Sequence, residues 1–168
     1  MVSILNMILI NISQAAVDVL GIYFKLQSFV FMPVFGLTQG LLPIIGYNFG
    51  ARNKKRMLSA VKIGCVIGVI IMAAGTALFQ LIPDKLIAIY NYSDDMMRIG
   101  VRALRIISLC FVPAALGIVF SSFFQGVGSG VRSLFISVLR QLIVIAPVAY
   151  YLSQFGEFAV WYAFPIAE

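Results

Sequence analysis

The chain has 168 residues, of which 62% are hydrophobic and 11% charged, and it carries a net charge of +6 with no histidine. A soluble domain has about 45–50% apolar and about 25% charged residues, so this composition is that of a membrane protein. The missing histidine excludes histidine-based catalysis and histidine metal sites. Cys65 and Cys110 lie in apolar runs and form neither a disulfide framework nor a metal-ligand pattern.

The first two predicted spans are residues 1–16, which resemble the end of a helix whose beginning is missing, and residues 19–46. The second span has 28 residues, almost all apolar, which exceeds the ~20 needed to cross a bilayer as a helix. Its prolines disfavour a straight helix, and Gly36 and Gly40, which are four residues apart, leave room for a close neighbour. We therefore expect a broken span whose candidate hinge residues are Pro33, Gly36, Gly40 and Pro43.

One stripe of the second span carries polar groups. Steps of three and four residues lead from Lys25 to Ser28, Met32, Phe35 and Gln39. A helix that lines a polar cavity has a use for such a stripe, so these residues are candidate substrate contacts. Structural alternatives stay open for four of them: Lys25 can snorkel to the surface, Gln39 can bond a neighbouring helix, and Met32 and Phe35 can pack.

With the remaining predicted spans, the chain has five spans, the first of them truncated, and part of a sixth. Basic residues follow the second and fourth spans, whereas acidic residues follow the third. The connections after the second and fourth spans are therefore predicted to be cytoplasmic, and the connection after the third span external. We expect a kink near Pro113 and Gly117, a basic loop over residues 46–57, and tight packing at the glycines of the third span. The predicted later spans are residues 58–82, 94–124, 132–152 and 158–168.

Two ionisable residues near the C-terminus are further candidates. Arg140 lies near the centre of the fifth span, and Glu168 lies in the sixth. Counted from the turn between these helices, both lie roughly 16–18 Å deep. A lone charge at that depth is costly, so we predict that they pair, with separate hydrated positions in a cavity as the alternative.

A long segment also resembles a known family. The run GIYFKLQSFVFMPVFGLTQGLLPIIGYNFGARNKKR is similar to the eighth-helix segment of multidrug and toxic compound extrusion (MATE) transporters, in the bacterial branch that carries Q-G-L-x-P-I-I-G-Y-N-[YF]-G-A. The likeness continues through FFQGVGSGVRS, LRQLIVIAPVAYYL and VWYAFPIAE. MATE transporters have two six-helix lobes. The resemblance implies that residues 1–168 form most of the second lobe, an all-α polytopic transmembrane bundle with its first and last helices truncated.

What the resemblance implies for function is a secondary antiporter, not an enzyme, in the bacterial cytoplasmic (inner) membrane. It would export organic, often cationic, compounds in exchange for H⁺ or Na⁺, with no cofactor and no nucleic acid. Its partners would be small-molecule substrates, the lipid bilayer and the missing N-terminal lobe. Some branches place a cation-binding carboxylate in the tenth helix, but no Asp or Glu lies between Met96 and Gln125 here. We therefore expect no metal site in this chain and a coupling ion bound in the missing lobe.

Two alternatives to drug export remain open. The first is a flippase of the same superfamily for lipid-linked precursors or polysaccharides, which would show a more cationic cavity. The second is a membrane scaffold that does not transport, which would have conventional straight spans without a polar stripe.

Overall fold

The computed structural model describes residues 6–7, 10, 14–90, 94–139, 146–153 and 159–167 of the chain. The regular structure of these residues is helical, which confirms the all-α prediction. The elements are α2 (Gln14–Gly50), α3 (Lys54–Leu81), α4 (Pro83–Ala88), α5 (Asp94–Ser108), α6 (Phe111–Gly126), α7 (Gly130–Val138), α8 (Ala146–Ser153), the 3₁₀ helix η2 (Ala159–Tyr162) and α9 (Ala163–Ala167).

Two helices, α2 with 37 residues and α3 with 28, are long and apolar enough to cross a membrane. The pair α5 and α6 makes a third candidate span if the bend of 48° between them is counted as part of one span. The other predicted spans, residues 1–16, 132–152 and 158–168, fall partly outside the described residues. The described helices are thus part of a membrane bundle.

The predicted break in the second span is wrong, because α2 runs without interruption and contains both prolines. Each proline removes one backbone donor, so the carbonyl oxygens of Phe29 and Gln39 lose their usual helical partners. The remaining hydrogen bonds of a long helix, together with its packing on α3 and α6, keep it continuous. The connection to α3 is also shorter than predicted, since only residues 51–53 separate the two helices.

The bend between α5 and α6 lies at Leu109 and Cys110, a turn before the predicted kink at Pro113. Pro113 has no N–H to donate to the carbonyl of Leu109, four residues earlier, and its ring clashes with that carbonyl. The N–H groups of Leu109 and Cys110 instead donate to the carbonyls three residues back, at 3.3 and 3.0 Å. The proline therefore ends α5 rather than bending the middle of the span.

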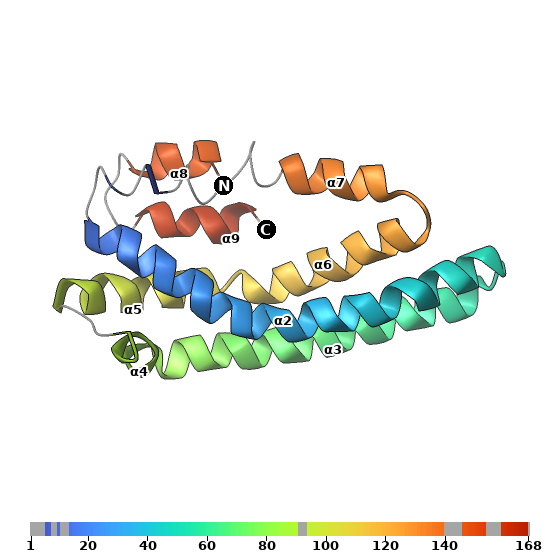
Figure 1. Ribbon diagram of the computed structural model, residues 1–168, viewed down its shortest axis with the longest axis horizontal. Helices are drawn as coiled ribbons and strands as arrows, with labels where there is room; N and C mark the ends of the chain where they lie inside the picture. Colours follow the sequence, from blue (N-terminus) through green and yellow to red (C-terminus); the bar gives the residue numbers. More distant parts are fainter. Residues whose placement is uncertain are drawn as a thin grey trace.

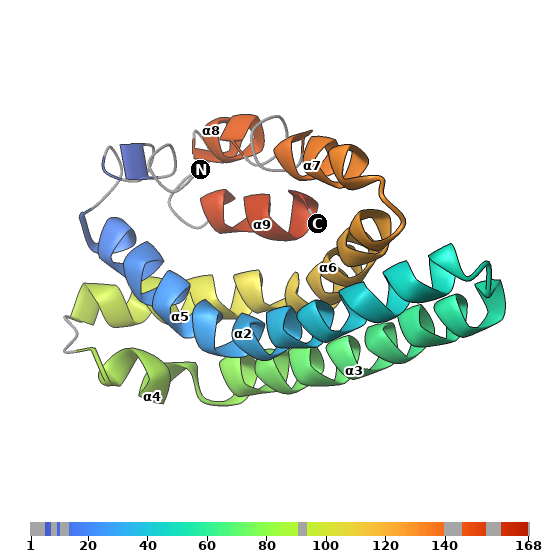
Figure 2. The ribbon, with the colours of Figure 1, turned by 45° about the vertical axis from the view of Figure 1, so that its right-hand side comes forward.

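The helices form two layers (Figure 1). One layer holds α2, α3, α5 and α6, with the short α4 at the end of α3. Across from it lie α7 and α8, and α9 runs between the two layers (Figure 2). The largest fully buried side chains, which form the core where α2, α3, α5, α6 and the C-terminal helices meet, include Tyr23, Phe79, Phe111 and Trp161.

Candidate functional site

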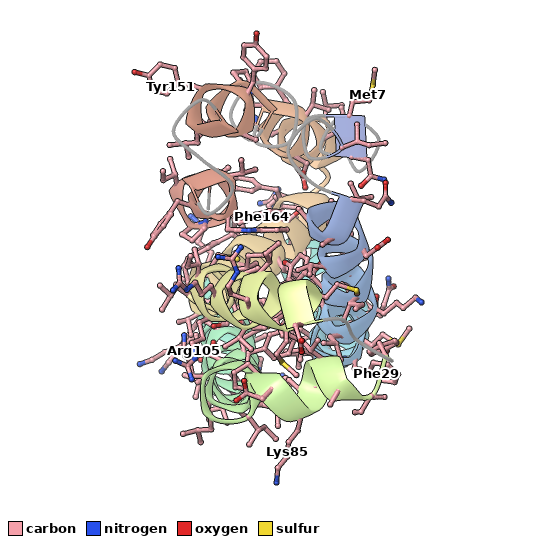
Figure 3. All side chains as sticks on the ribbon, turned by 90° about the vertical axis from the view of Figure 1, so that its left-hand side faces the viewer. Met7, Phe29, Lys85, Arg105, Tyr151 and Phe164 are labelled. Carbon is pink, nitrogen blue, oxygen red and sulfur yellow. The ribbon has the colours of Figure 1, made fainter. Side chains whose placement is uncertain are left out.

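A cavity of about 620 Å³ lies between α2, α6, α7 and α9. One face of α2 forms its longest wall, because the residues that line it recur at helical spacing between Tyr23 and Leu42. The opposite wall comes from α6 and the start of α7. Figure 3 shows Phe164 of α9 in the interior of the molecule, whereas Phe29 of α2 lies at its outer edge.

The lining is aromatic, with neutral polar groups between the rings. The rings of Tyr23 and Phe164 meet edge to face at 5.6 Å, and Phe31 packs on Phe35 at 6.3 Å. Such rings offer π-faces and edges to a ligand. The aromatic lining residues are Tyr23, Phe24, Phe31, Phe35, Phe120, Phe124 and Phe164, and the polar ones are Gln27, Ser28, Thr38, Gln39, Ser121, Ser122, Gln125, Ser133 and Ser137.

Hydroxyl groups of the cavity bond to the backbone of their own helices. Ser28 Oγ donates to the carbonyl of Phe24 at 2.8 Å, and Thr38 Oγ1 donates to that of Phe35 at 2.8 Å. On α6, Ser122 Oγ donates to the carbonyl of Ile118 at 3.1 Å. These bonds satisfy each hydroxyl proton within the helix and leave oxygen lone pairs as acceptors for a ligand.

A cluster of side chains ties α6 to α7 at the cavity wall. The hydroxyl oxygens of Ser121 and Ser133 are hydrogen-bonded to each other. The Gln125 amide donates to both of them, with Nε2 at 3.3 and 3.4 Å from the two oxygens. The tight turn between the helices uses Gly128 at a φ of +78°, which a residue with a side chain rarely adopts. This cluster fixes the start of α7 against α6 and gives the wall its polar character.

Three of the candidate contacts line the cavity and two do not. Ser28, Phe35 and Gln39 are in the lining. Lys25 is outside it and places its ammonium 5.4 Å from the ring centroid of Tyr90, a cation–π contact. Met32 is 66% exposed on another side of α2. Arg140 and Glu168 lie outside the described residues, so their predicted pairing stays a prediction.

The four hinge candidates, Pro33, Gly36, Gly40 and Pro43, are all exposed on α2. A Cβ built on either glycine would meet nothing within 4 Å. The two glycines are therefore not packed against any described helix, and the role of all four residues in bending stays a prediction.

Sequence reasoning missed more than half of the cavity. The predicted polar stripe begins at Lys25, whereas the face of α2 that lines the cavity includes Gln27, Phe31 and Thr38. The serines of α6 and α7 were overlooked as well, although hydroxyls in apolar helices are a usable signal: Ser121 and Ser122 are adjacent, and Ser133 and Ser137 are four residues apart.

Ionisable carboxylates and bases are absent from the described part of the lining, and no group of three potential metal ligands occurs among the described residues. What the described residues offer a ligand is therefore aromatic packing, cation–π attraction and neutral hydrogen bonds.

Comparison with known proteins identifies the family. The family model described as MatE matches residues 1–151. The chain belongs to the MatE family. Among curated MatE relatives, the multidrug export protein MepA of Staphylococcus aureus (strain MSSA476) is 29% identical over 167 residues, and the MepA of Staphylococcus haemolyticus (strain JCSC1435) is 27% identical over 166. Each alignment covers 98% of this chain and 36% of the relative, so the chain spans about a third of the length of these relatives.

Solved structures show the same MatE fold. An outward-facing multidrug resistance MATE family transporter of the MOP superfamily matches with a TM-score of 0.91 at 23% identity, covering 98% of this chain and 38% of that one. An inward-facing structure of such a transporter matches with a TM-score of 0.88 at 23% identity, covering 98% and 39%. The described helices thus form part of a MATE-type membrane bundle.

Proposed function

We propose that this chain forms the second lobe of a multidrug efflux antiporter, which exports organic, often cationic, compounds in exchange for H⁺ or Na⁺. Within it, the cavity between α2, α6, α7 and α9 takes the aromatic part of the exported compound. The single observation that carries the proposal is the lining itself, with seven aromatic rings around neutral hydroxyl and amide groups.

This lining fits varied aromatic compounds better than one fixed substrate. Ring faces attract organic cations without demanding one geometry, and their attraction is stronger where water is excluded. Hydroxyl oxygens accept hydrogen bonds from ligands of different shapes. Recognition of this kind is broad, which is what multidrug export requires.

The two alternatives find less support. A flippase for a lipid-linked pyrophosphate needs cations to hold its substrate, and the described lining contains no Lys or Arg. A scaffold has no use for a cavity of about 620 Å³ with amide and hydroxyl groups on its walls.

In the proposed transport cycle, this lobe and an N-terminal lobe rock against each other across a midplane cavity in the bacterial cytoplasmic membrane. The same lobe fold matches both an outward-facing and an inward-facing transporter, which supports rocking with little change inside the lobe. The coupling ion would bind in the N-terminal lobe, since α5 and α6 carry no carboxylate after the first turn of α5.

The test compares two phenylalanines of the same helix in the complete protein. Phe35 lines the cavity, whereas Phe29, six residues earlier, is 73% exposed and outside it. Phe35→Ala should lower the efflux of an aromatic cation such as ethidium about threefold to tenfold, the size of one lost cation–π contact. Phe29→Ala should leave it unchanged.

Efflux is measured in drug-sensitive bacterial cells at matched membrane expression, so that a loss of folded protein is not taken for a loss of binding. Equal efflux by Phe35→Ala and the wild type would show that the cavity is not on the substrate path. Equal losses in both variants would mean that α2 acts through its outer surface instead.

A further inference from the structure

A stripe of arginines runs along the exposed side of α5. Arg98, Arg102 and Arg105 are spaced by four and three residues, so they share one face, and all three are exposed. The same line continues into Leu109, which is 57% exposed. Asp94 lies one turn before Arg98 and offsets the charge at that end of the stripe. Arg105 is therefore the cation at the other end of the stripe, next to an apolar surface.

Hydrogen bonds fix the depth of this end. The Gln80 amide of α3 donates through Nε2 to the carbonyl of Arg105 at 2.9 Å and to Ser108 Oγ at 3.0 Å. One turn deeper, Thr76 Oγ1 donates to the carbonyl of Ser108 at 3.1 Å. Since α3 ends at Leu81, Arg105 lies level with the last turn of α3.

From this level, α3 presents a purely apolar outer surface down to its next cation. Lys62 precedes Gln80 by 18 residues, which at about 1.5 Å per residue is a distance of about 27 Å. That is close to the ~30 Å thickness of the hydrocarbon core of a bilayer. The exposed residues between the two are all apolar: Ile63, Val66, Ile67, Ile70, Ala73, Ala74, Ala77 and Leu78. This side of the molecule therefore has the dimensions of a lipid-facing surface, with cations at both of its edges.

We propose that Arg105, with Arg102 beside it, binds the phosphate of an anionic phospholipid in the leaflet at the α4 end, which the loop charges predict to be the outer one. The acyl chains lie over Leu109 and the adjacent surface of α3. A guanidinium suits this role because its N–H groups bond two phosphate oxygens at once. Among the described residues the Arg105 guanidinium has no ion-pair partner, so a phosphate displaces no internal contact there.

Lys85 lies on another side of the lobe from Arg105. Figure 3 shows Arg105 and Phe29 on opposite sides of the molecule, with Lys85 pointing away from both. Lys85 belongs to α4, at the same end of the molecule as Arg105, and is exposed. It thus provides a matched cation that is outside the proposed headgroup site.

The experiment uses the complete protein in nanodiscs that contain equal amounts of phosphatidylglycerol and phosphatidylcholine. After gentle extraction, native mass spectrometry counts the lipids that stay bound. The wild type should retain phosphatidylglycerol over phosphatidylcholine. Arg105→Gln should lower this preference about fivefold and the double change with Arg102→Gln by more, as expected for one basic side chain at an anionic surface. Arg105→Lys should keep part of it, and Lys85→Gln all of it.

Three outcomes would overturn the site. They are a wild type without lipid preference, an unchanged preference in the double variant, and an equal loss in Lys85→Gln, which would indicate only a general charge effect. Inorganic phosphate added to the wild type should not displace the lipid, because the acyl chains hold it; displacement would mean that the site takes free anions. Arg105→Lys keeps the test valid if the glutamine variants do not fold.

Discussion

The helices α2 and α3 carry the same glycine spacing and use it differently. Gly64 and Gly68 of α3 face neighbouring helices: a Cβ on Gly64 would collide with Leu41, and one on Gly68 would touch Val119 at 3.7 Å. Gly36 and Gly40 of α2 face open space, with nothing within 4 Å of either. The spacing permits close approach of a helix, but only the surrounding fold decides whether a helix is there.

The two glycine pairs differ because they lie on different faces of their helices. In α3 the glycines belong to its buried face, which also contains Met57, Val61 and Met72. In α2 the buried face passes through Leu26, Val34 and Leu41, and the pair lies away from it. Within the described lobe, the α3 glycines are therefore structural, whereas the α2 glycines are available to a neighbour outside it.

The largest expected effect comes from adding a side chain at a glycine on the buried face of α3. In Gly75→Val, the new Cβ collides with Val30 of α2, whose branched side chain has little freedom to move. We expect a loss of about 1–3 kcal/mol in stability, as for other overpacked cores. It is measured as a lower melting temperature and a lower monodisperse yield in detergent.

The matched control is Ala74→Val, which adds a similar bulk on the exposed side of the same helix turn. It should leave both quantities unchanged. If the two variants were equally stable, the contact between Val30 and Gly75 would not hold α2 against α3.

How far the sequence predicts the fold depends on whether the signal is local. Hydropathy identifies α2, α3 and the α5–α6 pair, because the length and polarity of a span are properties of its own residues. The effect of a proline is less local. Pro33 and Pro43 were expected to break α2 and do not, whereas Pro113 ends α5 one turn earlier than expected. The difference is set by packing, which the sequence does not display.

The candidate site was predicted only in part for a similar reason. Ser28 and Gln39 were predicted because polar groups in an apolar span are conspicuous, and Phe35 because it lies on the same stripe. The rotation of the helix about its axis was not predicted, because the stripe that begins at Lys25 is offset from the cavity-lining face by about one residue position. The α6 and α7 walls could not be predicted from local sequence, because they depend on the fold that brings Ser121 and Ser133 together.

An intermediate effect is expected at Pro33, on the same exposed side of α2 as Gly36. Pro33→Ala restores a donor for the carbonyl of Phe29 and stiffens the helix. If α2 bends during transport, insertion and yield stay normal while drug efflux becomes slower. Efflux is compared at equal expression with that of Pro43→Ala, which lies nearer the end of the helix. Undiminished efflux in Pro33→Ala would show that the proline is merely tolerated.

The smallest effect is expected for Gly36→Ala, and its sign sharpens the comparison between the two helices. Alanine favours a helix over glycine by up to about 1 kcal/mol, and the added methyl group meets nothing within 4 Å. We therefore expect a slightly higher melting temperature in detergent. Gly75→Ala, in which the same methyl group collides with Val30, should lower it. A lower melting temperature for Gly36→Ala in the complete protein would contradict an open face. In that case another helix, outside the described residues, would pack on the α2 glycines as closely as α2 itself packs on α3.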